Sequence, residues 1–287
     1  RHEKLLADKL VPEPASLHED LAASSPLLKA PHRWHLLHNH GYFGRHEQDT
    51  TPSMWPHDGT DRSKTSAAYQ HMIHKYIRCV AAIDGNIRRV LGYLEDEGIK
   101  DETLIVYTSD QGYWLGQHGL YDKRLILEES LKMPLVVRYP ARIKAGTVNQ
   151  DLVSNVDFAP TLLEYAGLEP DPRMQGRSIT PLLSGKAPSD WRRAIWYAYW
   201  AGGHPHWGMR SERYKLALFP GTDDFEFYDL REDPREMTNL AGNRRYAGEI
   251  ARARKTVESL IKEVQITPEQ LPGRNLVERQ RNPNPKK

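Results

Sequence analysis

Residues 66–98 carry the pattern that most constrains the fold of this chain. Apolar residues recur there at intervals of three and four, and Gly98 follows as a stop signal, which predicts a long amphipathic helix packed on one side. Residues 103–108 then form a short apolar, β-branched run that ends in a turn, the composition of a buried strand. A second such run covers 134–140, and a second helix is expected over 155–165.

The order of these segments indicates the fold class. A helix, a strand, a loop, a strand and a helix in succession predict an α/β fold with a mostly parallel central sheet. Beyond residue 186 the pattern changes to three aromatic-rich runs at 194–200, 214–219 and 226–230, which predict a small antiparallel sheet. A charged amphipathic helix is expected over about 244–264.

This organisation divides the chain into four regions. The first is irregular and rich in Pro and His, the second is the α/β part, the third is a small α+β subdomain, and the fourth is a Pro-rich basic tail that we expect to be disordered. Their predicted boundaries are 1–65, 66–186, 187–270 and 271–287.

Composition excludes several classes of protein. The 287 residues carry 40 Lys and Arg against 38 Asp and Glu, a net charge of +2, so there is no bulk electrostatic reason to expect nucleic-acid binding. No apolar run is long enough to span a membrane. The single cysteine, Cys79, forbids an intrachain disulfide, and its place on the first predicted helix suggests a small buried hydrophobe.

Polar side chains gather directly after the first predicted strand. Asp110 and Gln111 follow the strand, and His118 and Lys123 lie in the glycine-rich loop beyond it. The carboxyl ends of strands in α/β sheets open into the ligand crevice, and carboxylate and carboxamide oxygens suit Ca²⁺ or Mg²⁺ better than zinc. Each residue also has an ordinary alternative: a turn for Asp110, a packed imidazole for His118 and a solvated ammonium for Lys123.

The motif around these residues resembles that of a known enzyme family. Ser109-Asp110-Gln111-Gly112 precedes Leu115-Gly116-Gln117-His118-Gly119-Leu120 and then Lys123, which is similar to the S-D-[NHQ]-G, L-G-x-H-G and downstream Lys of the sulfatases in the alkaline-phosphatase superfamily. Further segments that resemble the same family follow in the family's order between about residue 73 and residue 240. They resemble most closely the carbohydrate sulfatases of the heparan, N-acetylglucosamine-6-O-sulfate or iduronate type.

The resemblance implies a fold and an activity. Residues 66–186 would be the C-terminal part of an alkaline-phosphatase-like catalytic domain, a central sheet flanked by helices, followed by the small antiparallel subdomain with its packing helix. The activity implied is sulfuric ester hydrolysis on a sulfated carbohydrate, with one Ca²⁺ and a formylglycine nucleophile. The full-length protein would work in the periplasm, outside the cell or in a lysosome-like compartment.

The resemblance also implies roles for individual residues. Asp110 and Gln111 would be metal ligands, although Gln111 departs from the commoner Asn or His. Lys123 would hold a sulfate oxygen and His118 would line the catalytic site. His206 and Arg210 fall where related carbohydrate sulfatases carry substrate-facing residues.

One element of the family pattern is absent. No C-x-P-S-R, the site of formylglycine formation, occurs in these 287 residues. We therefore expect the chain to be the C-terminal part of a sulfatase and to be inactive by itself. Two alternatives stay open: a phosphodiesterase or phosphonate hydrolase of the same superfamily, and a non-catalytic remnant that binds sulfated glycans or packs against a partner.

Overall fold

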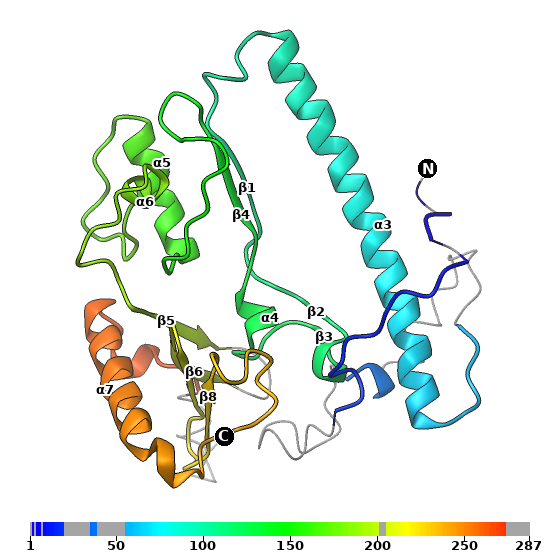
Figure 1. Cartoon of the computed structure of the whole chain (residues 1–287). Coiled ribbons are helices and arrows are strands. Elements are labelled where there is room, and N and C mark those ends of the chain that lie inside the picture. The colour runs from blue at the N-terminus through cyan, green and yellow to red at the C-terminus, as the bar shows by residue number, and fades with distance from the viewer. Residues whose placement is uncertain are drawn as a thin grey trace, which may run out of the picture. The chain divides into compact units, whose positions relative to one another are not determined.

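The computed structural model describes residues 2, 4–6, 8–19, 35–38, 55–200 and 205–273 (Figure 1). Most of the tail predicted to be disordered, 274–287, lies outside the described residues. The chain forms two compact units. The first comprises Arg1–Leu104, Gln111–Lys123 and Glu129–Met133, and the second comprises Ile105–Asp110, Arg124–Glu128 and Pro134–Lys287.

The first unit is built on one long helix, α3 (Asp61–Asp96). The helix begins five residues before the predicted start because Thr60 caps it, accepting a hydrogen bond from the Ser63 N–H. Irregular backbone packs on its first half. Leu17 and Leu36 are fully buried against it, and the side chain of Gln70 exchanges two hydrogen bonds with the backbone of Val11.

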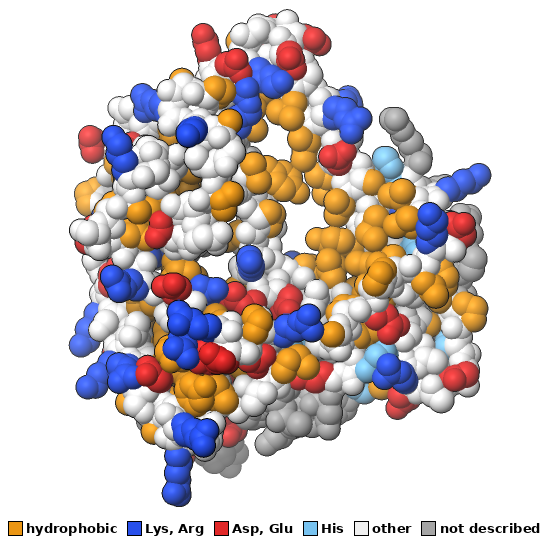
Figure 2. Space-filling view, in the orientation of Figure 1, with side chains coloured by type: hydrophobic (Ala, Val, Ile, Leu, Met, Phe, Trp, Pro, Cys, Tyr) orange, Lys and Arg blue, Asp and Glu red, His pale blue; other side chains and the backbone are white. Residues whose placement is uncertain are grey.

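Among the described residues, no backbone segment packs on the second half of α3 as it does on the first half. The predicted apolar stripe continues there, yet Val80, Ile83, Val90 and Tyr93 are between 45% and 61% exposed, and hydrophobic side chains lie along the helix in Figure 2. Cys79 shares this environment and is exposed, so the expectation of a buried cysteine is wrong. None of the described helices combines the length and apolar character needed to cross a membrane.

The two predicted central strands pair with each other in the second unit. They are β1 (Ile105–Thr108) and β4 (Leu135–Arg138), which run antiparallel with Ile105 opposite Arg138. The expectation of a mostly parallel sheet is therefore wrong for the described strands. A parallel pair needs a crossover, usually a helix, and the only helix between these strands is α4 (Glu128–Leu131), a single turn. Val106, Tyr107 and Val136 are also exposed rather than buried.

A short hairpin follows β1 along the chain in the first unit. Its strands are β2 (Trp114–Leu115) and β3 (Tyr121–Asp122), joined by a 3-10 turn at Gln117–Gly119. Gly116 has φ 91°, which glycine adopts without strain, and its N–H donates to the Leu120 carbonyl to close the loop.

Two short helices lie in the second unit, and the second of them contributes Leu182 to a small separate core with Ile179 and Trp191. A 3-10 turn at Asn155–Asp157 leads into α5 (Phe158–Tyr165), as predicted, and α6 (Thr180–Leu183) follows. Asp157 is fully buried, where its carboxylate accepts hydrogen bonds from the backbone of Ser154 and Arg177 and pairs with Arg192.

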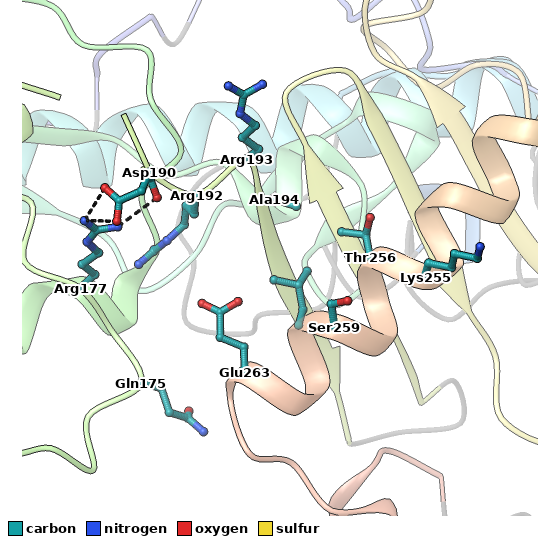
Figure 3. Close-up of a pocket in the computed structure, with 11 residues that line it drawn as sticks. Gln175, Arg177, Asp190, Arg192, Arg193, Ala194, Lys255, Thr256, Ser259 and Glu263 are labelled. Carbon is teal, nitrogen blue, oxygen red and sulfur yellow. Dashed lines mark hydrogen bonds and ion pairs between the residues drawn. The ribbon is translucent and has the colours of Figure 1, made fainter. Parts of the chain in front are cut away.

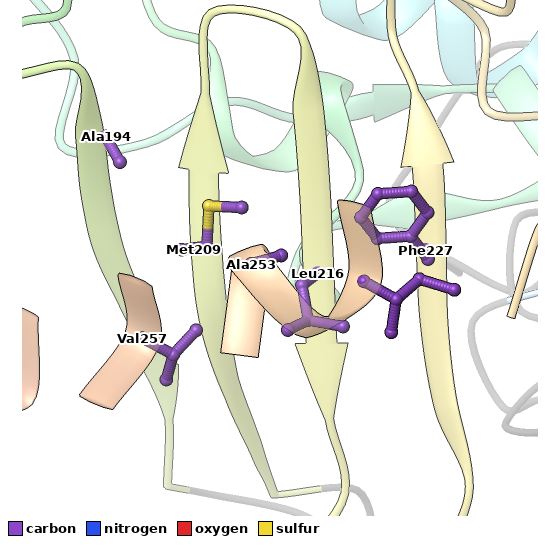
Figure 4. Packing of buried hydrophobic residues seen from close by; sticks show 7 residues of the cluster. Ala194, Met209, Leu216, Phe227, Ala253 and Val257 are labelled. Atoms are coloured by element: carbon purple, nitrogen blue, oxygen red, sulfur yellow. The ribbon is translucent and has the colours of Figure 1, made fainter. Parts of the chain in front are cut away.

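The C-terminal part of the second unit is an antiparallel sheet covered by one helix, as predicted, but the sheet has four strands where the sequence predicted three. The strands are β5 (Ala194–Tyr199), β6 (His206–Ser211), β7 (Tyr214–Leu218) and β8 (Phe225–Asp229), in that order. Helix α7 (Ala247–Glu263) follows a 3-10 turn at Arg244–Tyr246, and a last 3-10 turn lies at Pro268–Gln270. Apolar side chains of the sheet and of α7 interdigitate in one core (Figure 4).

Truncating the centre of this core tests its contribution to stability. Leu216 is fully buried, so Leu216→Ala should lower the free energy of unfolding by about 2–5 kcal/mol through lost burial and the cavity left behind. Leu168→Ala removes the same atoms from a side chain that is 58% exposed and should cost less than about 1 kcal/mol. Denaturant unfolding measures both, and equal losses would contradict this assignment of the core.

Candidate functional site

Asp110 and Gln111 follow the carboxyl end of β1 in the chain, as predicted. Asp110 ends the segment of the second unit that carries β1, and Gln111 opens the segment of the first unit that carries His118 and Lys123. The Asp110 carboxylate is exposed, accepts one long hydrogen bond from the Ser109 hydroxyl at 3.3 Å, and forms no ion pair with a described residue. It is thus available as a hard oxygen ligand.

Gly112 fixes the backbone next to these two residues by a close approach. Its N–H donates to the Ser130 carbonyl at 2.9 Å. A Cβ at this position would lie 2.0 Å from the Glu129 carbonyl oxygen and 2.6 Å from that of Lys132. The sequence marks Gly112 as a turn residue, but its physical role is to let the 129–132 backbone pass directly behind the Asp110-Gln111 pair.

His118 is buried and held by groups far away in the sequence. Its side chain is 2% exposed, and its backbone has φ 56°, an unusual value for a residue with a Cβ. Nδ1 lies 2.7 Å from Oε2 of Glu19, and the backbone N–H donates to the Ser16 hydroxyl at 3.0 Å. A carboxylate on one ring nitrogen fixes the orientation of the imidazole.

Glu19 is a site residue that the sequence did not reveal. It lies 99 positions from His118 in an irregular segment with no periodicity and no motif. The second ring nitrogen, Nε2, lies 3.9 Å from Oε2 of Glu129, so two carboxylates flank the imidazole.

Lys123 follows β3 directly and is partly exposed. Its ammonium forms no ion pair with a described residue, in contrast to the buried Lys215 discussed below. The residues on either side have positive φ, 75° at Asp122 and 131° at Arg124. Such backbone persists in a non-glycine residue only where its surroundings impose it, so the path of the chain through Lys123 is tightly specified.

His206 and Arg210 lie on β6, where both already have partners. His206 is fully buried, with its ring 5.5 to 5.8 Å from the rings of Tyr197, Tyr199 and Phe219. The guanidinium of Arg210 pairs with the Glu128 carboxylate at 3.0 Å. Substrate binding by these two residues stays a prediction, and the contacts seen give each of them a structural role.

A polar pocket of about 460 Å³ lies elsewhere in the second unit, between the 175–194 segment and α7 (Figure 3). Four cationic side chains line it, but Arg177 pairs with Asp190 and Arg192 pairs with Asp157. None of the predicted site residues lines this pocket. The candidate site therefore stays the segment from Asp110 to Lys123, as predicted from the sequence, and lies outside this pocket.

The residues present fit one part of a divalent-cation site. Asp110 and Gln111 supply oxygen donors of the type that Ca²⁺ prefers, whereas Ca²⁺ takes six to eight oxygen ligands. Across the described residues, no three His, Cys, Asp or Glu side chains are grouped so that they could hold a metal ion. Asp110 and Gln111 therefore fit only part of such a site.

Family models match most of the chain. The model described as "Sulfatase" matches residues 33–168, and the one described as "N-sulphoglucosamine sulphohydrolase, C-terminal" matches residues 116–263. The chain belongs to the sulfatase family.

Individual relatives agree with this assignment. The chain is 45% identical over 205 residues to an N-acetylglucosamine-6-O-sulfatase of Bacteroides thetaiotaomicron, covering 69% of this chain and 36% of that protein. A solved structure in complex with its substrate D-glucosamine-2-N,6-O-disulfate matches with a TM-score of 0.84 at 32% identity, covering 94% of this chain and 63% of the other. A phosphonate monoester hydrolase of Agrobacterium radiobacter matches with a TM-score of 0.64 at 28% identity, covering 72% and 43%.

These matches show an alkaline-phosphatase-like sulfatase fold, as the sequence motif implied. The chain spans about a third of the length of the curated relative and less than two thirds of that of the solved structure in complex with its substrate.

The close approach at Gly112 generates a prediction. Gly112→Ala should lower the melting temperature markedly, because the added Cβ would displace the 129–132 backbone. Gly92→Ala is the matched control, since a Cβ there meets nothing within 4 Å and alanine gains about 1 kcal/mol of helix propensity inside α3. Thermal unfolding followed by circular dichroism compares the two. Similar melting temperatures for both variants would show that the backbone behind Asp110 is not closely packed.

Proposed function

We propose that the full-length protein is a Ca²⁺-dependent sulfatase that releases sulfate from a sulfated amino sugar of the glucosamine type. The observation that carries the proposal is the Asp110-Gln111 pair followed along the chain by His118 and Lys123, in a chain 45% identical to an N-acetylglucosamine-6-O-sulfatase. The compartment proposed is the periplasm, the cell exterior or a lysosome-like organelle.

Each site residue would have a role that follows from the charge and polarity of its side chain. Asp110 and Gln111 would hold the cation, which supplies positive charge to the sulfate oxygens when it is bound, while a formylglycine would supply the nucleophile. The Lys123 ammonium would contact a sulfate oxygen whose negative charge grows as the ester bond breaks. His118, oriented by Glu19 at 2.7 Å, would present Nε2 as a donor to the same charged group.

The match to one solved structure supports a second candidate activity. The fold match to a phosphonate monoester hydrolase keeps phosphonate or phosphodiester hydrolysis open, since that enzyme shares the architecture. Parallel assays on glucosamine 6-sulfate and on an aryl phosphonate monoester separate the two. We expect a higher kcat/KM for the sulfate ester, and a higher value for the phosphonate would overturn the sulfatase proposal.

Lys123 provides a direct test of the site. In the full-length enzyme, Lys123→Ala should lower kcat/KM by roughly two to three orders of magnitude, the scale of losing one preorganised partner of a developing oxyanion. The melting temperature should change little, because the ammonium has no ion pair among the described residues. The control is Lys144→Ala at an exposed lysine. A change of less than fivefold in a folded Lys123 variant would remove this residue from the site.

Asp110 provides a test of the metal. Asp110→Ala in the full-length protein removes a formal charge from a hard-cation site, so the dissociation constant for Ca²⁺ should rise by roughly tenfold or more. Asp223→Ala, at an exposed carboxylate of the second unit, is the matched control and should bind Ca²⁺ like the parent. Isothermal titration calorimetry after chelator treatment measures both. Unchanged affinity in the Asp110 variant would rule out its role as a ligand.

A further inference from the structure

The four residues that follow Lys123, 124–127, take a path without regular secondary structure and lead into helix α4 at Glu128. In Arg124–Glu128, the side chains of Leu125, Ile126 and Leu127 are 4%, 1% and 3% exposed, although helix α4 begins only at Glu128. No internal ladder of hydrogen bonds holds this segment, so its position depends on the packing of these three side chains and on polar groups at its two ends.

The first end is held by two tyrosines of β5. The Tyr197 hydroxyl donates to the Arg124 carbonyl at 2.7 Å, and the Arg124 guanidinium donates to the Tyr199 hydroxyl at 3.3 Å. Burial raises the pKa of the Tyr197 hydroxyl above its ordinary value, which keeps it protonated as a donor. These bonds act where Arg124 has φ 131°, and they help to impose that strained backbone.

The second end is held by four charged side chains, of which Lys215 and Glu236 are buried. The Glu128 carboxylate lies 2.9 Å from the Lys215 ammonium and 3.0 Å from the Arg210 guanidinium, and the Glu128 N–H donates to Oε2 of Glu236 at 2.7 Å. Lys215 also lies 2.6 Å from Oε1 of Glu236. Lys215 is fully buried and Glu236 is 2% exposed, whereas the side chains of Arg210 and Glu128 are 22% and 19% exposed. Burial raises the pKa of the Glu236 carboxyl, and the nearby Lys215 ammonium works against this rise.

The register of the sheet explains why Glu128 is needed. Arg210 on β6 lies directly opposite Lys215 on β7, and like charges at facing positions destabilise a sheet. Glu128 contacts both cations and removes this repulsion. Burial works to raise the pKa of its carboxyl, but the charges of Lys215 and Arg210 outweigh burial and lower the pKa to about 2.

Stability alone is a poor reason for such an arrangement. Desolvation of buried charges offsets most of their attraction, and packed apolar residues of similar volume often give equal or greater stability. Directional ion pairs do, however, fix the place of a backbone that has no secondary structure of its own.

We propose that Arg210, Lys215 and Glu236, together with Tyr197, form a clamp on residues 124–128 that positions the backbone from which Lys123 projects. The proposal rests on the proposed function of Lys123 as a sulfate-binding residue. The clamp residues are positioning residues, and Arg210 belongs to them through its contact with Glu128.

The test uses Lys215→Met in the full-length enzyme, which removes the charge and keeps the length of the side chain. We expect faster hydrogen–deuterium exchange over residues 124–128 and a fall in kcat of about tenfold to a hundredfold, the scale of a small misplacement of a catalytic group, with KM changed less than threefold. Ca²⁺ affinity should stay unchanged. Lys144→Met at an exposed lysine is the matched control.

A double variant separates a positioning role of Lys215 from a general loss of structure. If Lys215 acts through Lys123, then Lys215→Met added to Lys123→Ala should lower kcat less than twofold further. Equal losses in both backgrounds, or faster exchange over 124–128 with an unchanged kcat, would overturn the clamp. If Lys123→Ala itself has no effect while exchange at 124–128 still rises, the proposed role of Lys123 fails and the clamp loses its function.

If Lys215→Met does not fold, Tyr197→Phe replaces it. This variant deletes only the hydroxyl that donates to the Arg124 carbonyl. The same measurements apply, with a smaller expected fall in kcat of about threefold to tenfold, and an unchanged kcat in this folded variant would overturn the proposal.

Discussion

The ion pairs of the buried Lys215 ammonium with Glu128 and Glu236 join three parts of the second unit: strand β7, the turn at Glu236 and the segment after Lys123. A fully buried lysine is costly unless it is paired, so these contacts must form together or not at all. Arg210 on β6 depends on the same carboxylate. The sheet, its register and the path of residues 124–128 are therefore coupled through one group of charges.

A comparable contact orients the histidine of the first unit. Glu19 and Ser16 approach His118 from an irregular segment and fix its ring and its backbone. His118 is thus held by a side chain 99 positions away, and Arg124, the residue after Lys123, by one 73 positions away. The proposed ester cleavage would require precise placement of charged groups, and in these two places long-range contacts hold otherwise irregular backbone.

Local patterns predicted the regular elements, and they failed where a contact over long sequence distance decides the structure. The spacing of apolar residues predicted α3 and α7, and aromatic runs predicted β5, β7 and β8. Strand β6 was missed because Gly208, His206 and Arg210 do not look like strand residues. Gly208 is required there, since a Cβ would lie 1.8 Å from the Leu216 carbonyl oxygen, and the other two find partners in tertiary contacts.

The candidate site was predictable to a similar degree. The motif from Ser109 to Lys123 indicated the ligand types and the chemistry, because the residue types follow one another in the chain. Glu19, Glu128 and Glu236 carried no local signal, since each acts through a partner 87 to 108 positions away.

A crystal structure of the full-length enzyme with sulfate bound in the presence of Ca²⁺ tests the central claim most directly. The account predicts a cation coordinated by Asp110 and Gln111, with the Lys123 ammonium within hydrogen-bonding distance of a sulfate oxygen, roughly 2.7–3.2 Å. Sulfate bound at another place, with Lys123 directed into solvent and no cation at Asp110, would contradict it.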